Sequence, residues 1–169
     1  MISLLKTSDA ALDDIAAMAK IIWQHHYIDI IGEAQVQYML NKFYSHDALI
    51  KQVNEGQVFN FIMRHEQAIG YIAYTLQADQ ICFINKYYIL PEYQGKSVGS
   101  KSLNLLENTI NKDSKSSFNC FKLTVNRQNF KSINFYFKNG FTIESVADFD
   151  IGNGYVMNDF IMKKLIQSC

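Results

Sequence analysis

Near the start of the chain, hydrophobic residues recur at every third or fourth position, which is the spacing of one helix face. This pattern predicts a first helix over residues 12–26, and Ser8 or Asp9 is placed to cap its start. The apolar face of this helix consists of Leu12, Ile15, Ala16, Ala19, Ile22, Trp23 and His26.

Two further helices are expected before any strand-like run begins. One covers residues 34–43, and the other follows Ser45, which is a good N-cap residue. The third helix should end near Gly56, because glycine adopts the left-handed conformation that stops helices.

The pattern then changes to short runs rich in β-branched and aromatic residues. Residues 58–63 and 68–76 predict a hairpin whose polar turn lies at residues 65–67. Residues 81–90 are apolar at nearly every position, which is typical of a strand covered on both faces, and so we expect this strand to be central. The pattern breaks at residues 85–86, which indicates a bulge.

After a glycine-containing turn, a helix face is formed by Gly99, Ser102, Leu103, Leu106 and Ile110. Alternation at residues 119–125 predicts a strand, and residues 129–138 predict a helix. Two strands, residues 141–149 and 155–163, flank Gly152-Asn153-Gly154, a strong hairpin signal. The order of elements predicts a mixed α/β sheet.

Composition fits a globular enzyme or binding domain. The 169 residues are expected to form a single domain, 1–169, with 49% hydrophobic and 19% charged residues. The formal net charge is zero, which argues against binding of nucleic acid by bulk electrostatics.

The cysteines and the apolar runs indicate the compartment. Cys82, Cys120 and Cys169 are widely spaced, and buried thiols in a reducing cytosol are the expected interpretation. No run approaches 18 apolar residues and no signal peptide is recognised, so we expect a cytoplasmic protein without a membrane partner. The four histidines lack ligand spacing, and no metal is expected.

The chemistry is expected at residues 87–100, a buried strand followed by a glycine-bearing loop and a helix start. A helix start exposes unpaired N–H groups that bind phosphate, and Lys96 adds a cation. An ordinary strand-to-helix turn would use Gly95 and Gly99 in the same way, so from these residues alone both interpretations stay open.

Two blocks in this half of the chain resemble the GCN5-related N-acetyltransferase family. Residues 94–99, Gln-Gly-Lys-Ser-Val-Gly, are similar to its Gln/Arg-x-x-Gly-x-Gly/Ala motif, with Ser97 in place of the first motif glycine. Residues 129–141 resemble its later run Asn-x-x-Ala/Ser-x-x-Phe/Leu-Tyr-x-Lys/Arg-x-Gly-Phe. One helix and one strand separate the blocks, as the family shows.

The resemblance implies a mixed, mostly antiparallel sheet with helices on both faces. The two central parallel strands, residues 81–90 and 119–125, would splay into a V that holds acetyl-CoA as the acetyl donor. The implied cofactor-binding residues are Tyr87, Tyr88, Ile89, Gln94, Gly95, Lys96, Ser97, Val98, Gly99, Ser100, Asn129, Ser132 and Lys138. A backbone N–H near Ile89 would donate to the thioester oxygen.

The resemblance also implies that Tyr136 is the general acid for the departing thiolate, although the residue pattern alone favours a core aromatic. By resemblance, Asn85 lies at the position on the central strand where family members with a strong base have Glu. Its amide cannot accept the proton that leaves the amine. The base therefore stays open between a water chain, Tyr88 and an acidic residue such as Asp148, Asp150 or Glu33.

The expected reaction is direct attack by a primary amine in a ternary complex, without a covalent enzyme intermediate. By resemblance the first helices frame the acceptor, and the implied substrate-binding residues are Trp23, Tyr27, Glu33 and Asn85. Aromatic and acidic side chains suit a cationic amine. The segment 23–39 resembles polyamine-acetylating members, while an amino sugar, an aminoglycoside or a peptide or protein amine is an alternative acceptor.

Two other functions compete with acetyl transfer. A CoA-binding regulatory module without turnover would explain Ser97 and Asn85. An α/β domain with no nucleotide site is the third possibility. A homodimer fits the family, but the sequence does not show one.

Overall fold

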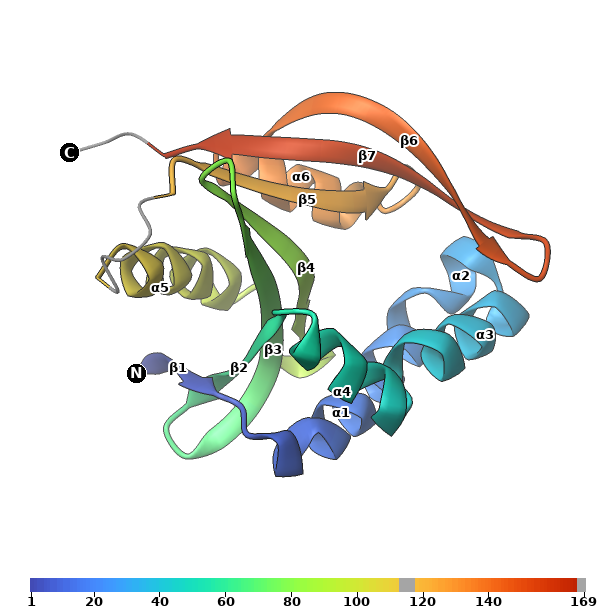
Figure 1. Ribbon diagram of the computed structural model, residues 1–169, viewed down its shortest axis with the longest axis horizontal. Helices are drawn as coiled ribbons and strands as arrows, with labels where there is room; N and C mark the ends of the chain where they lie inside the picture. The colour runs from blue at the N-terminus through green and yellow to red at the C-terminus, as the bar shows by residue number, and fades with distance from the viewer. Residues whose placement is uncertain (113–117, 167–169) are drawn as a thin grey trace.

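The computed structural model describes residues 1–112 and 118–166, which form a seven-stranded sheet flanked by helices (Figure 1). The strand order is β1-β2-β3-β4-β5-β7-β6. The strands are β1 (Ile2–Lys6), β2 (Val58–Arg64), β3 (Gln67–Gln77), β4 (Ile81–Ile89), β5 (Cys120–Asn126), β6 (Thr142–Gly152) and β7 (Tyr155–Leu165). The helices are α1 (Leu12–His26), α2 (Ile28–Ile31), α3 (Glu33–Tyr44), α4 (His46–Asn54), α5 (Val98–Lys112) and α6 (Phe130–Lys138).

The central strands β4 and β5 form the parallel pair of the sheet, and they stay together only briefly. Residues Ile81, Cys82, Phe83 and Ile84 pair with Cys120, Phe121, Lys122 and Leu123, and beyond this register the two strands diverge. Figure 1 shows β5 and β4 leaving a common end in different directions. The predicted V-shaped splay of a mixed, mostly antiparallel sheet is therefore confirmed.

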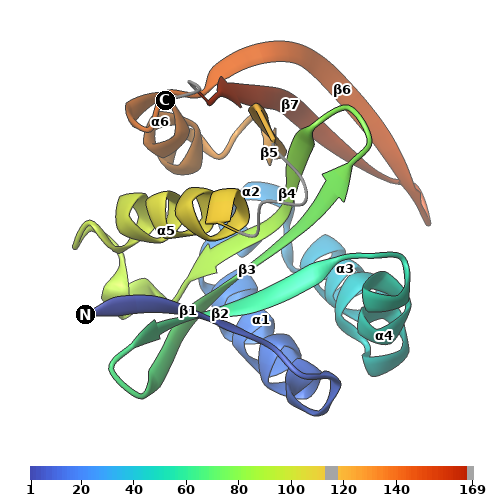
Figure 2. The ribbon, with the colours of Figure 1, turned by 60° about the vertical axis from the view of Figure 1, so that its left-hand side comes forward.

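Helices cover both faces of the sheet, and each face has its own core. Tyr71 and Ile72 are neighbours on β3 and both are fully buried, but they belong to different cores. Tyr71 packs with Ile15 and Leu49 under α1, α3 and α4, whereas Ile72 packs with Leu106 under α5 (Figure 2). Burial of each such side chain contributes about 1.5–3 kcal/mol, so both layers hold the sheet firmly.

A bulge in β4 sets which side chains face which core. Ala73 of β3 lies opposite Lys86, and Tyr74 lies opposite Ile84, so Asn85 is the extra residue. The extra residue shifts the alternation of β4. Lys86 and Tyr88 consequently face the α1–α4 layer, whereas Tyr87 and Ile89 face the α5 layer. The bulge predicted at residues 85–86 is confirmed.

The β6–β7 hairpin reaches across the molecule to α3 (Figure 1). The Tyr38 hydroxyl donates to the carbonyl of Ile151 at 2.6 Å, and the Gln35 amide donates to the carbonyl of Val156 at 3.3 Å. The hairpin tip is thereby tied to the helical layer.

Three local features differ from the sequence-based expectations. β1 was missed because only one face of this short edge strand is partly covered, so that its alternation is weak. The single-turn α2 was missed as well. The prediction of Ser8 or Asp9 as the cap of α1 was wrong: a 3-10 turn precedes the helix, and its N-cap, Ala11, makes no side-chain capping bond.

Other local predictions hold. The Ser45 hydroxyl accepts from the Ala48 N–H at 3.3 Å and caps α4, and Gly56 follows that helix with a φ of +92°. Cys82 and Cys120 are buried free thiols, and Cys169 lies outside the described residues. Within residues 1–112 and 118–166, none of the helices is long and apolar enough to cross a membrane.

Candidate active site

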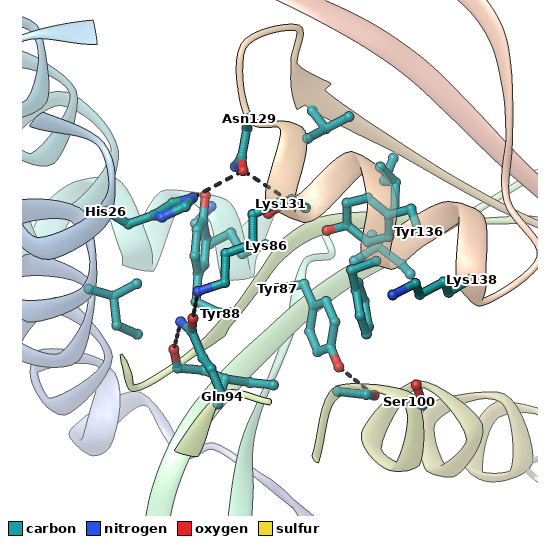
Figure 3. Close-up of a pocket in the computed structure, with 18 of the residues that line it drawn as sticks. His26, Lys86, Tyr87, Tyr88, Gln94, Ser100, Asn129, Lys131, Tyr136 and Lys138 are labelled. Carbon is teal, nitrogen blue, oxygen red and sulfur yellow. Dashed lines mark hydrogen bonds between the residues drawn. The ribbon is translucent and has the colours of Figure 1, made fainter. Parts of the chain in front are cut away.

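A cavity of about 450 Å³, here called the V cleft, lies where β4 and β5 separate (Figure 3). Most of the predicted cofactor-binding residues line it: Tyr87, Tyr88, Ile89, Gln94, Gly95, Ser97, Gly99, Ser100, Asn129, Ser132 and Lys138. Lys96 and Val98 do not. The Lys96 ammonium bonds the carbonyl of Glu92 at 2.9 Å, and Val98 is packed into the core beneath β2 and β3.

The loop between β4 and α5 is shaped to present backbone N–H groups. Gly95 and Ser97 both have positive φ, +74° and +58°, and α5 begins immediately afterwards. Left-handed residues in a short loop turn successive N–H groups toward one side, and the first N–H groups of a helix have no partner within it. The loop is therefore suited to hold an anion such as a pyrophosphate.

Tyr87 fixes the start of α5 against β4. Its hydroxyl donates to the carbonyl of Gly99 at 2.6 Å and lies 2.8 Å from the Ser102 hydroxyl. Gly99 also allows a close approach to α6, because a Cβ at this position would lie 2.7 Å from the Phe135 ring. The narrow end of the V cleft thus depends on a hydroxyl of β4 and on the absence of a side chain on α5.

Tyr136 projects from α6 into the V cleft, where Figure 3 shows its hydroxyl pointing into the open space. Its ring packs against Phe135 and Phe141 and is only 8% exposed, so it is both a core aromatic and a cleft residue. Burial raises the pKa of the Tyr136 phenol above its ordinary value of 10.0. The hydroxyl therefore keeps its proton at neutral pH and can donate it.

A buried amide joins α1 to α6 across the wide end of the V cleft. Asn129 is 1% exposed, and its side-chain oxygen accepts from the Ser132 N–H at 3.1 Å and from His26 Nε2 at 3.1 Å. Its amide nitrogen donates to the Tyr27 hydroxyl at 3.3 Å. Burial lowers the pKa of His26, so the imidazole is neutral at physiological pH.

A second polar bridge crosses the mouth of the cleft. The Lys131 ammonium donates to the Gln94 side-chain oxygen at 2.6 Å, and the Gln94 amide donates to the carbonyl of Ile89 at 2.8 Å (Figure 3). The carbonyl of Ile89 therefore points to the open side of β4. Because the N–H and C=O of one strand residue point the same way, the Ile89 N–H also faces the cleft.

A second cavity of about 250 Å³ adjoins the V cleft on the α1–α3 side. Residues that line both are Tyr27, Asn85, Lys86, Tyr88, Thr124 and Val125. Its walls are rich in aromatic rings, with the Trp23 centroid 4.9 Å from that of Tyr27 and 5.9 Å from that of Tyr88. The two cavities thus meet where β4 and β5 part.

The second cavity contains one cation and one carboxylate among its described lining residues. Burial lowers the pKa of Lys86 to about 8, and its ammonium bonds the Gln52 side-chain oxygen and lies 5.4 Å from the Tyr44 ring centroid. Asp159 of β7 is 6% exposed. Burial raises the pKa of its carboxyl from 3.8 to about 6, against the opposing effects of a Thr124 hydrogen bond and the Arg127 charge.

The predicted acceptor residues divide. Trp23, Tyr27 and Asn85 line the second cavity, whereas Glu33 is exposed in the first turn of α3 and lines neither cavity. The Asn85 side-chain oxygen accepts from the Thr75 hydroxyl at 2.9 Å. Asp159, Lys86, Lys131 and His26 were absent from the predicted site. The sequence did hold a signal for Asp159, since an acidic residue stands at an inward-facing position of the alternating strand β7.

None of the acidic residues suggested as bases lines either cavity, whereas Tyr88 lines both. Asp148 pairs with Arg127, and an Asp150 carboxylate oxygen accepts from the Gly152 N–H at 2.7 Å; neither lines the two cavities. Burial raises the pKa of Tyr88 well above 10.0, which makes its phenol a poor proton acceptor. Among the described residues, no three His, Cys, Asp or Glu side chains gather into a metal-binding group.

Comparison with known proteins agrees with this geometry. The model of the acetyltransferase (GNAT) family matches residues 15–141. A curated relative, the spermidine N(1)-acetyltransferase of Thermoplasma acidophilum, is 27% identical over 172 residues and covers 99% of this chain and 99% of its own length.

Solved structures are similar over nearly the whole chain. The PaiA N-acetyltransferase from Thermoplasma acidophilum in complex with coenzyme A has a TM-score of 0.79 and 26% identity, with 98% of this chain and 99% of that chain covered. The spermidine N-acetyltransferase from Vibrio cholerae in complex with CoA and spermine has a TM-score of 0.68 and 18% identity over 97% and 95% of the two chains, and this likeness concerns the fold.

Replacing Ser97 with glycine should stabilise the protein. A non-glycine residue at a φ of +58° is strained, and glycine removes that strain at the cost of a more flexible unfolded chain, for a net gain of about 0.5–1 kcal/mol. Urea unfolding of Ser97→Gly measures this gain. Lys101→Gly, an exposed position inside α5, should instead lose about 0.5–1 kcal/mol. Equal losses in both variants would contradict the strain at Ser97.

The carboxyl of Asp159 should make stability depend on pH. Below about pH 4 this group is protonated in the folded and unfolded states, and no penalty arises. As the pH rises through about 6, the folded state must ionise a buried group, which destabilises the wild type by about 2–3 kcal/mol relative to Asp159→Asn. Urea unfolding at about pH 4 and about pH 7.5 tests this expectation. A difference between the two proteins that does not change with pH would refute it.

Proposed function

The chain belongs to the acetyltransferase (GNAT) family and is an acetyl-CoA-dependent N-acetyltransferase, and we propose that it acetylates a primary amine of a small polyamine. The observation that carries the proposal is the junction of two cavities at the parting of β4 and β5. The V cleft has the features that bind a nucleotide thioester, and the second cavity has those that bind an alkylammonium group. Their shared wall at Tyr27, Tyr88 and Thr124 is where donor and acceptor would meet.

The V cleft fits the acetyl donor, which supplies an activated thioester when bound. The N–H groups of residues 95–100 would bind the pyrophosphate. Beyond Ile84 this edge of β4 does not pair with β5, and Tyr87 to Ile89 would bond the pantetheine arm as an added strand does. Asn129, Ser132 and Lys138 line the opposite side.

Two groups of the V cleft would act on the reacting atoms. The Ile89 N–H faces the cleft and would donate to the thioester oxygen as negative charge develops there. The Tyr136 hydroxyl, held in its protonated form, would give a proton to the departing sulfur. Direct attack by the amine is favoured over a cysteine intermediate, because burial raises the pKa of both Cys82 and Cys120 and disfavours their thiolates.

The second cavity suits an alkylammonium chain. Aromatic faces attract cations, and each such contact contributes about 0.5–2 kcal/mol. Rings from Trp23, Tyr27, Tyr44 and Tyr88 line the space, and the carboxylate of Asp159 adds a negative charge. The similarity over the whole chain to a protein named spermidine N(1)-acetyltransferase supports a polyamine over an amino sugar or a peptide amine.

Release of CoA thiol from acetyl-CoA against a panel of amines tests the proposal. Spermidine, spermine and short diamines should give turnover, while amino sugars, aminoglycosides and short peptides should give little. Turnover with the peptides alone would move the acceptor to a protein amine. Stabilisation by acetyl-CoA in a thermal shift, without turnover on any amine, would favour the non-catalytic CoA-binding module.

Tyr136→Phe should separate catalysis from cofactor binding. The change removes the acidic hydroxyl but keeps the ring packed against Phe141, so kcat should fall about 100-fold or more while acetyl-CoA affinity stays within about 2-fold. Steady-state kinetics and calorimetric titration measure the two quantities. Tyr38→Phe removes a phenol that bonds the Ile151 carbonyl outside both cavities, and it should leave kcat unchanged. An unchanged kcat in Tyr136→Phe would remove the acid role.

A further inference from the structure

Among the described residues that line the second cavity, Asp159 has the single carboxylate, and so far it has been given no part in proton transfer. We propose that Asp159 receives the acceptor: its carboxylate binds the incoming ammonium group and takes the proton that must leave before the nitrogen can attack. This inference rests on the proposed function, since it concerns the amine side of the same reaction.

The sheet places Asp159 beside the junction of the two cavities. On β7 it lies directly opposite Asn126 of β5, and so the two side chains share one face of the sheet. Thr124, two residues earlier on β5, shares that face and lines both cavities. Thr124 lies close enough to Asp159 to lower the pKa of its carboxyl, so the carboxylate is next to the place where donor and acceptor would meet.

No other acidic side chain of the described residues lines either cavity. Asp148, the acid nearest on β6, already pairs with Arg127 at the surface. Neutral His26 lines the V cleft, and its Nε2 donates to Asn129, so the proton-accepting nitrogen of the ring is the other one. Asn85 leaves β4 without a base, and the acid that could take this role, Asp159, lies two strands away on β7.

The charged and titratable groups around Asp159 come from several elements. Tyr27 follows α1, Lys86 and Tyr88 come from β4, Arg127 follows β5, and Asp148 comes from β6. The Lys86 ammonium lies over the Tyr44 and Phe59 rings and bonds Gln52, so its positive charge sits at a different wall of the cavity. Its charge repels a second ammonium there, which leaves Asp159 as the favourable place for the substrate cation.

The proton balance of the reaction fits this role. The ammonium gives one proton to the Asp159 carboxylate, which later passes it to solvent. The free nitrogen attacks the thioester carbon, so that a C–N bond forms and the C–S bond breaks. The second proton lost from nitrogen balances the one that Tyr136 gives to sulfur, and the third stays on the amide. A carboxyl with a pKa of about 6 is ionised at neutral pH and close enough to it to accept a proton.

Asp159→Asn tests the inference in the full-length protein. It should lower kcat/KM for spermidine about 100-fold or more, and leave the Kd for acetyl-CoA within about 2-fold. Spermidine titrated into the cofactor-free protein should bind about 10-fold more weakly or worse, which is a readout independent of turnover. In the wild type, kcat/KM should fall as the pH drops below about 6, because the carboxylate becomes protonated, and this fall should be absent in the variant. The residual rate of the variant should instead rise with pH as free amine accumulates.

Two further variants separate this role from a structural one. Asp159→Glu keeps the charge and should recover about 10-fold or more of the lost kcat/KM. Glu144→Gln removes a carboxylate of the same sheet that pairs with Lys122 and Lys163 outside both cavities, and it should leave the kinetics unchanged. Because the buried carboxylate is itself destabilising, Asp159→Asn should fold, and its unfolding curve checks this directly.

The outcomes are distinct. Wild-type turnover of spermidine with an equally active Asp159→Asn overturns the inference and leaves the proposed function standing. A reduced kcat/KM in Asp159→Asn that comes with unchanged spermidine binding and the same fall below about pH 6 as the wild type also overturns it. Absence of wild-type turnover on every amine of the panel overturns the proposed function, and the inference with it.

Discussion

The parting of β4 from β5 after Ile84 is the constraint on which the whole site depends. A strand in the middle of a sheet normally has partners on both edges, because unpaired backbone groups are costly when buried. Here one edge of β4 is open beyond a short parallel register. The Gln94 amide satisfies the carbonyl of Ile89, and the neighbouring N–H is left facing the cleft. The fold thus keeps a row of backbone donors and acceptors in place for a ligand that can complete the sheet.

A one-residue irregularity in β4 decides which of its side chains line the second cavity. If β4 paired through Asn85 without a bulge, its alternation would place Tyr87 on the α1–α4 side and Lys86 and Tyr88 on the other. Tyr87 would then lose its bond to Gly99, and the start of α5 would lose its anchor. The bulge therefore links the loop between β4 and α5 on one face to the aromatic second cavity on the other.

The donor side was predictable from the sequence, and the acceptor side only in part. Residues 87–100 form one continuous strand, loop and helix start, and so their local pattern already indicates what they can bind. The second cavity is instead assembled from α1, β4, β5 and β7, and the β5–β7 register brings Asp159 to Thr124. No spacing rule relates residues that meet through sheet pairing. Glu33 shows the converse, since an acid next to the predicted groove turns outward on α3.

Burial has opposite chemical consequences for the two groups that would move protons. It raises the pKa of Tyr136 and of Asp159 alike, because both become charged by losing a proton. For the phenol, whose pKa already lies above neutrality, the shift secures the protonated form and makes a donor. For the carboxyl, the shift brings the pKa up toward neutrality and makes an acceptor that can also release its proton. Burial thus fits each group to its proposed role: Asp159 would take a proton on the amine side at β7, and Tyr136 would give one on the sulfur side at α6. The stability lost by burying an ionised carboxylate is consistent with this function, since a site optimised for stability alone would hold an amide there.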